Sequence, residues 1–121
     1  MKKGLRYCCE FANNPFIEGE KLVDVYDVVL KLSKSALELM YYILDTKAFL
    51  EDKFVLDINE FKKFTNKKSD TSAIQALGEL CCVGIIAKTR VTRVYWVNKD
   101  VFVNEKAVDF IKAFFRYKKG I

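Results

Sequence analysis

Residues 69–98 read "SDTSAIQALGELCCVGIIAKTRVTRVYWVN", and the order of elements within this stretch decides the predicted fold. The first half has apolar residues at helical spacing, and Ser69 is the expected N-cap of that helix. Gly84 should end it, because glycine readily adopts the left-handed conformation that follows a last helical turn. Two β-rich runs, at 85–88 and 93–98, then predict a hairpin. The apolar residues of the helix that should face the core are Ala73, Leu77 and Leu80.

The tip of this predicted hairpin is basic. Arg90, Val91, Thr92 and Arg93 occupy it, without the glycine, asparagine or aspartate that normally supply positive φ. Glycine or asparagine would make an easier turn but would bring no positive charge. We therefore expect Arg90 and Arg93, with Lys88 on the leading strand, to contact phosphates. The alternative is that the arginines only keep an edge strand soluble.

Upstream, residues 33–51 ("SKSALELMYYILDTKAFLE") predict an amphipathic helix. Ser33 or Ser35 is the expected N-cap, and Glu38 lies at the capping-box spacing from Ser35. The stripe predicted to face the core comprises Leu37, Met40, Tyr41, Leu44 and Ala48. Before this helix, residues 20–32 ("EKLVDVYDVVLKL") start like a strand and end as a helical turn.

Between the two predicted helices lie a short strand, "FVL" at 54–56, and a short helix at 58–64. Asp57 should cap this helix, and "TNKK" at 65–68 turns the chain into the next one. Its inward residues are Ile58, Phe61 and Phe64. Helix, short strand, short helix, turn, helix and hairpin is the order of a winged helix-turn-helix. The predicted fold class is α+β, mostly helical with a small antiparallel β-wing and an added C-terminal helix.

The last helix should begin at Asn104 and end at Gly120. Its apolar stripe is Ala107, Phe110, Ile111 and Phe114, with Phe115 and Tyr117 beside it. Such a stripe either packs on its own domain or forms the seam of a homodimer. Adjacent helical side chains point about 100° apart, so both Phe114 and Phe115 are hard to bury in a small monomer. The candidate dimerisation residues are therefore Phe110, Phe114 and Phe115.

A chain of 121 residues forms one domain's core. The predicted organisation is an N-terminal extension at 1–20 with no assigned role, a winged helix-turn-helix domain at 21–103, and the C-terminal helix at 104–121 as a candidate dimerisation element. No apolar stretch approaches the roughly 18–20 residues that a membrane span needs. The N-terminus lacks the apolar core of a signal peptide, so we expect a cytoplasmic protein without a membrane partner.

Positive charge is concentrated in one part of the chain. Residues 62–99 carry eight basic and two acidic residues, whereas the rest of the sequence carries 13 basic and 14 acidic ones. A surface selected for solubility mixes the two signs. A segment of one sign is instead the pattern expected of a protein that binds a polyanion.

The sequence offers little for catalysis. It contains no histidine, no close pair of acidic residues on an apolar background and no glycine-rich phosphate loop, so we expect no enzyme and no cofactor, and a nuclease is the least favoured interpretation. The cysteines form two adjacent pairs, Cys8–Cys9 and Cys81–Cys82, which lack the spacing of a zinc knuckle. Reduced thiols packed as small apolar side chains are favoured over a four-thiolate zinc site.

Three segments resemble the winged-helix replication initiators of small plasmids, the RepL-type family: "KLVDVYDVVLKLSKSALELMYYILD", "SDTSAIQALGELCCVGII" and "VYWVNKDVFV". The resemblance covers about residues 21–103. Its closing pattern is held by Tyr95, Val97, Asn98 and Phe102, with Lys99 where the family has proline. The resemblance implies a DNA-binding protein of plasmid or phage type that acts in replication initiation or transcription regulation.

In that interpretation double-stranded DNA is the partner, with helix 69–82 as the recognition helix and hairpin 87–98 as the wing. The residues expected to contact DNA are Lys62, Lys63, Lys67, Lys68, Ser69, Thr71, Ser72, Gln75, Lys88, Arg90 and Arg93. The recognition face departs from the family, which usually places basic or amide residues there, because it carries Ile74 between Asp70 and Glu79. This departure motivates the alternative of a winged-helix protein-interaction module that does not bind DNA. Single-stranded nucleic acid could stack on an aromatic residue of the hairpin, but we expect Trp96 to face the core.

Overall fold

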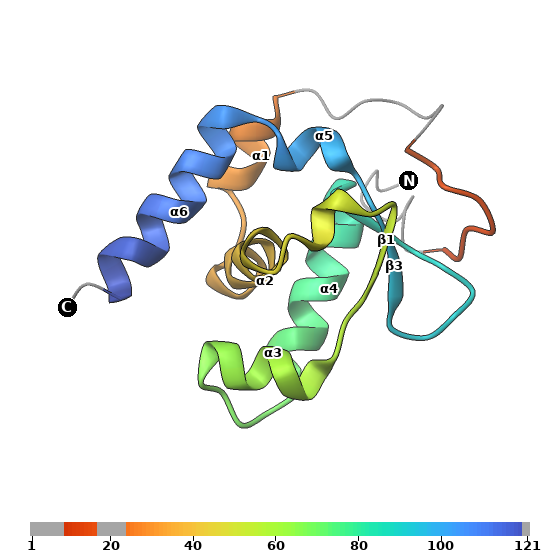
Figure 1. The fold of residues 1–121 in the computed structure, drawn as a ribbon, viewed down its shortest axis with the longest axis horizontal. Coiled ribbons are helices and arrows are strands. Elements are labelled where there is room, and N and C mark those ends of the chain that lie inside the picture. The colour runs from red at the N-terminus through yellow and green to blue at the C-terminus, as the bar shows by residue number, and fades with distance from the viewer. Residues whose placement is uncertain (1–8, 17–23, 120–121) are drawn as a thin grey trace.

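The structure is a computed structural model that describes residues 9–16 and 24–119, with side chains to Phe115. The described residues form six α-helices, one 3-10 helix and three strands (Figure 1). In chain order these are α1 (Val25–Leu30), α2 (Lys34–Asp45), η2 (Ala48–Leu50), β1 (Lys53–Val55), α3 (Ile58–Thr65), α4 (Thr71–Val83), β2 (Ile86–Lys88), β3 (Val94–Val97), α5 (Lys99–Phe102) and α6 (Glu105–Lys119). The predicted α+β class is confirmed, and the order from α2 to β3 matches the predicted one, except that η2 follows α2 within the range 33–51 predicted as one helix.

Local capping chemistry sets where the central helices begin. The Ser33 hydroxyl accepts the Ala36 backbone N–H at 3.2 Å, so Ser33 rather than Ser35 caps α2. Glu38 forms no capping box, since its carboxylate lies 2.9 Å from Lys67 Nζ and the residue is buried. Asp57 caps α3 as predicted, accepting N–H groups from the second and third helical residues.

The start of α4 differs from the prediction by one residue. Asp70, not Ser69, holds the N-cap position, and its side chain makes no capping bond. The Ser69 hydroxyl instead accepts the Thr71 backbone N–H at 3.1 Å, just outside the helix. At the other end Gly84 follows the last helical residue with φ 83°, as predicted.

Two predictions about the outer helices need correction. Residues 25–30 form the helix α1, although β-branched residues suggested that this part begins as a strand; residues 20–23 of that prediction lie outside the described residues. The four-residue helix α5 was not foreseen. Asn104 does begin α6, because its Oδ1 accepts the Ala107 N–H at 3.0 Å, whereas Gly120 lies outside the described residues.

The sheet is antiparallel with the strand order β1-β3-β2. Phe54 of β1 and Lys88 of β2 both pair with Tyr95 of the central strand. Tyr95 is 6% exposed and faces the core, whereas Trp96 is half-buried on the other face, so the prediction for Trp96 is wrong. The reason is that each face of β3 carries one valine and one aromatic residue, and alternation alone cannot choose between them.

The helix α2 lies at the centre of the fold, between α6 on one side and α4 with the sheet on the other (Figure 1). Its fully buried residues are Ala36, Leu39, Met40 and Ile43. Of the predicted stripe, Leu37 and Met40 are buried, whereas Tyr41 and Leu44 are only half-buried. Ala48 lies outside α2, because the helix predicted over 33–51 ends at Asp45. The predicted inward residues of α4, Ala73, Leu77 and Leu80, are all buried.

The helix α6 packs on α2 through a stripe different from the one predicted. Ala107, Ile111 and Phe115 are buried, whereas Phe110 and Phe114 are half-buried. The Phe115 ring stacks on Tyr41 with 4.9 Å between centroids. Phe115 therefore packs within its own chain, and of the three candidate dimerisation residues only Phe110 and Phe114 keep partly exposed rings.

Glu79 joins α4 to the first turn of α2. Its two carboxylate oxygens accept the Ser33 backbone N–H at 2.7 Å and the Ser33 hydroxyl at 2.6 Å. A carboxylate at a helix N-terminus is further stabilised by the helix dipole. Glu79 is therefore part of the scaffold, and its negative charge is already matched by donors.

We expect Glu79→Gln to lower the free energy of unfolding by about 1–2 kcal/mol, because the amide loses the charge and can accept through only one oxygen. Urea unfolding measures this loss, with Glu51→Gln at an exposed position as the matched control. A loss no larger than that of the control would contradict the role given to Glu79.

Candidate functional site

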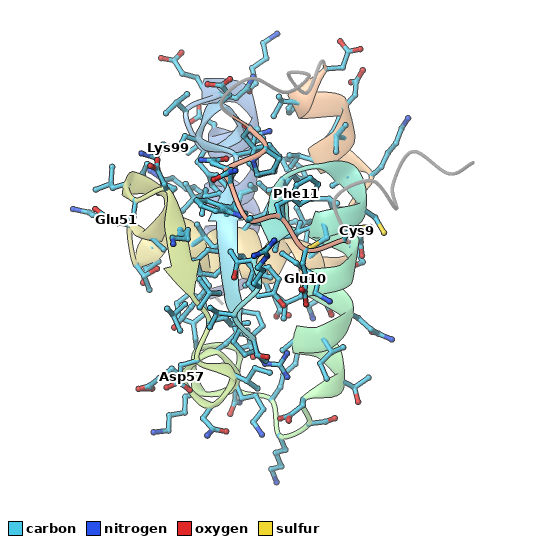
Figure 2. All side chains as sticks on the ribbon, turned by 90° about the vertical axis from the view of Figure 1, so that its right-hand side faces the viewer. Cys9, Glu10, Phe11, Glu51, Asp57 and Lys99 are labelled. Carbon is cyan, nitrogen blue, oxygen red and sulfur yellow. The ribbon has the colours of Figure 1, made fainter. Side chains whose placement is uncertain are left out.

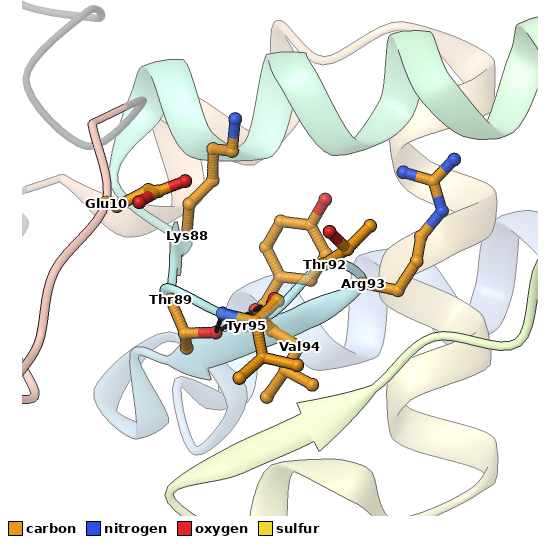
Figure 3. A pocket seen from close by; sticks show the side chains of 8 residues that line it. Glu10, Lys88, Thr89, Thr92, Arg93, Val94 and Tyr95 are labelled. Carbon is orange, nitrogen blue, oxygen red and sulfur yellow. Dashed lines mark hydrogen bonds between the residues drawn. The ribbon is translucent and has the colours of Figure 1, made fainter.

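A groove of about 260 Å³ lies between α4 and the hairpin, which is defined here as residues 86–97. One wall is α4, and the other is the face of the hairpin that carries cationic side chains. The lining residues are Ile74, Leu77, Gly78 and Cys81 from α4, with Lys88, Arg93 and Tyr95 from the hairpin. Figure 3 shows that Lys88, Arg93 and Tyr95 all extend toward α4. We refer to this feature as the α4–hairpin groove.

The strand register explains why Lys88 and Tyr95 share one face. Lys88 is the Cα partner of Tyr95 in the antiparallel ladder, and paired residues project to the same side. Arg93 precedes β3 and has a left-handed backbone, so strand alternation does not place it, but its side chain also lines the groove and extends toward α4. Two cations and a phenol are therefore brought together from both sides of the hairpin.

The hairpin turns without glycine because a threonine side chain organises the connection. The Thr89 hydroxyl accepts the Val91 backbone N–H at 3.0 Å and donates to the Val94 carbonyl at 2.9 Å. Arg93 takes the left-handed conformation, with φ 68°. That conformation costs an ordinary residue roughly 1 kcal/mol or more. Sequence reasoning missed both features, although a threonine two residues before the turn is a recognisable signal.

Tyr95 contributes a neutral hydroxyl to the groove. Burial raises its pKa above the usual value, Cys81 adds to the increase, and the charge of Arg93 and a hydrogen bond to Arg93 oppose it. The phenol is therefore protonated at neutral pH and does not cancel the positive charges of Lys88 and Arg93.

Two of the lysines predicted to contact DNA form ion pairs within the chain. Lys62 Nζ lies 2.8 Å from Asp70 Oδ1, and Lys67 Nζ lies 2.9 Å from Glu38 Oε1. Lys67 also lines a separate groove of about 280 Å³ between α2, α3 and α6, which it shares with Tyr41, Phe64 and Phe115. Lys67 is therefore not part of the α4–hairpin groove.

Three other basic residues predicted to contact DNA are exposed to solvent. Lys63 is exposed, with Glu60 4.0 Å away, and Lys68 is exposed in the loop before α4. Arg90 is exposed at the hairpin tip. The Asp70 carboxylate would repel a phosphate, but Lys62 pairs with it and offsets that repulsion.

The exposed face of α4 carries Thr71, Ile74, Gln75 and Gly78, and Ser72 beside them is half-buried. Ile74 is 51% exposed and is the large apolar side chain on this face. The side chains of this face are neutral. Positive charge comes to the groove only from the opposite wall, through Lys88 and Arg93.

The described N-terminal segment, 9–16, covers part of the hairpin (Figure 2). The Phe11 N–H donates to the Lys88 carbonyl at 3.0 Å, and the Trp96 indole N–H donates to the Phe11 carbonyl at 3.0 Å. Glu10 lines a second pocket with Lys88 and Arg93, and Figure 3 shows it beside Lys88. Residues 9–16, the described part of the predicted N-terminal extension, thus pack on the hairpin and hydrogen-bond the Trp96 indole.

Comparisons with models of known families, with curated proteins and with solved structures find no match. The resemblance to RepL-type initiators therefore stays a prediction from the sequence. Within residues 9–16 and 24–119, no group of three or more His, Cys, Asp or Glu could hold a metal ion. Among the same residues, no helix has the length and apolar character needed to cross a membrane.

Proposed function

We propose that this chain is a non-enzymatic, winged helix-turn-helix protein that binds double-stranded DNA. In this proposal α3 and α4 form the helix-turn-helix, α4 enters the major groove, and the hairpin is the wing. The role implied by the sequence resemblance is replication initiation or transcription regulation for a plasmid or phage. The observation that carries the proposal is the α4–hairpin groove, in which Lys88 and Arg93 face an uncharged, exposed helix face.

The arrangement suits both tasks of a DNA-binding surface, which are to contact base edges and to hold the phosphate backbone. The major groove of B-DNA admits one α-helix, and Thr71 and Gln75 on the exposed face of α4 can bond base edges. Contacts to phosphates fix the register of the protein on the duplex without reading sequence. Arg90, Arg93 and Lys88 on the hairpin, with Lys68 before α4, would supply those contacts.

The salt dependence of binding tests this proposal. No ion pair among the described residues involves Lys68, Lys88, Arg90 or Arg93, and Lys63 is only weakly paired. Four or five neutralised phosphates give a slope of log K against log salt of about −3.5 to −4.5. Fluorescence anisotropy with a labelled random duplex at several salt concentrations measures it. A slope shallower than about −2, or no binding, would overturn the proposal.

A protein partner is the second candidate, and the exposed Ile74 favours it. An apolar residue next to cations could equally meet an acidic protein surface with an apolar centre. Both acidic residues that suggested this alternative, Asp70 and Glu79, have partners within the chain, which weakens its case. The salt titration separates the two candidates, because the interaction module binds no duplex at any salt concentration.

A further inference from the structure

We infer that the DNA read by α4 is rich in A·T pairs, and that Ile74 contacts the methyl groups of thymine. The inference rests on the proposed function. It starts from the exposure of Ile74, which lies in the α4–hairpin groove on the wall facing Lys88 and Arg93. An occupant of this groove must therefore be anionic at one side and apolar at the other.

Duplex DNA meets both conditions in its major groove. The phosphates that border the groove match the cations of the hairpin, and the thymine C5-methyl is the apolar group on the groove floor. Ile74 projects from the same exposed face as Thr71 and Gln75, so one helix face presents an apolar contact beside two hydrogen-bonding side chains. The thymine methyl group is thus an apolar partner for Ile74 within the proposed DNA ligand.

The composition of α4 points away from G·C pairs. Guanine is best recognised by bidentate Arg or Lys, and α4 (Thr71–Val83) contains neither. Gln75 is exposed on this helix, and a glutamine side chain can pair with the N6 and N7 atoms of adenine. Ile74 and Gln75 therefore favour the two members of the same base pair.

Gly78 supports a close approach at this face. It lies one turn after Ile74 and also lines the groove, and a Cβ built on it meets no atom within 4 Å. Packing within the protein therefore does not require glycine there, although glycine costs a helix interior about 0.5–1 kcal/mol relative to alanine. Bare backbone at this position leaves room for a base edge or sugar to come near the helix.

The test compares three duplexes of equal length and charge: an A·T duplex, a G·C duplex, and the A·T duplex with every thymine replaced by uracil. Uracil lacks only the methyl group, which lies in the major groove. We expect the full chain to bind the A·T duplex at least tenfold more tightly than the G·C duplex. Replacement by uracil should weaken binding about three- to fivefold for each methyl contacted.

Three variants assign this discrimination to α4. Ile74→Ala should bind the thymine and uracil duplexes equally, whereas Val103→Ala, at a 66% exposed position outside the groove, should discriminate like the original chain. Gly78→Ala should weaken binding to all three duplexes while raising the melting temperature. Any weakening in this variant then reflects lost access and not lost folding.

The outcomes separate this inference from the function on which it rests. Salt-dependent binding with equal affinity for thymine and uracil would overturn the inference and leave DNA binding intact. The inference also fails if Ile74→Ala discriminates between the two duplexes as well as the original chain does. Absence of binding to all three duplexes would overturn the proposed function itself.

Discussion

Replacing Arg90 and Arg93 together by alanine should weaken binding to every duplex by a similar factor, about 30-fold at low salt. Phosphate contacts carry no sequence information, so the ranking of duplexes should stay unchanged. The slope of log K against log salt should become shallower by about 2, because two fewer counterions are released. Alanine at Arg93 keeps a Cβ at a residue with positive φ, so the backbone strain of the turn is retained. Equilibrium binding at four salt concentrations measures both effects.

The matched control is Lys31→Ala combined with Lys106→Ala. Both lysines are exposed. Lys31 follows the last residue of α1 and Lys106 is in the first turn of α6, and both helices lie away from the hairpin (Figure 1). The control removes the same net charge without touching the α4–hairpin groove. An equal loss of affinity in the two double variants would mean that net charge alone attracts DNA, and the hairpin would then have no specific role.

Phe115→Ala should lower the free energy of unfolding by about 3–4 kcal/mol, because it removes a large ring from a packed core. Phe115 is 6% exposed and stacks on Tyr41, and Phe114 meets it edge-on at 4.9 Å. The loss should be the same at any protein concentration, since these contacts lie within one chain. Urea unfolding at two protein concentrations a hundredfold apart provides the measurement.

Phe114→Ala is the matched variant for this experiment, because its ring is half-buried on the same helix turn. It should cost clearly less stability than Phe115→Ala. If α6 forms a homodimer, the Phe114 variant should be the one that shifts sedimentation toward the monomer. A Phe115→Ala loss that disappears at low protein concentration would instead place Phe115 at a subunit seam.

The helices near the centre of the chain could be predicted because their signals are local. Asp57 caps the helix that follows it, and Gly84 stops α4 through its own backbone freedom. Features set by distant contacts could not be predicted in this way. The inward side of β3 depends on its pairing with Phe54, and α1 is helical despite a β-branched sequence because Val25 and Val29 are buried against the rest of the core.

The sequence could predict which segment carries the basic residues of the candidate site, but not which of their side chains face the groove. The count of basic residues in 62–99 located the region, and Lys88 and Arg93 do meet at one groove. Charge counts cannot say which lysines pair with carboxylates elsewhere in the chain. Lys67 turns toward Glu38 on α2, and Lys62 toward Asp70, so two of the five lysines expected to contact DNA are engaged within the protein.

The indole of Trp96 is the only one in the sequence, and it lies on the hairpin and not in the central core. It donates to the Phe11 carbonyl, and Lys53 Nζ stands 4.9 Å from its ring centroid. Tryptophan emission, as distinct from that of the six tyrosines, therefore originates at one place. We expect this emission to change when the segment 9–16 detaches from the hairpin, because the indole then loses its hydrogen bond to Phe11.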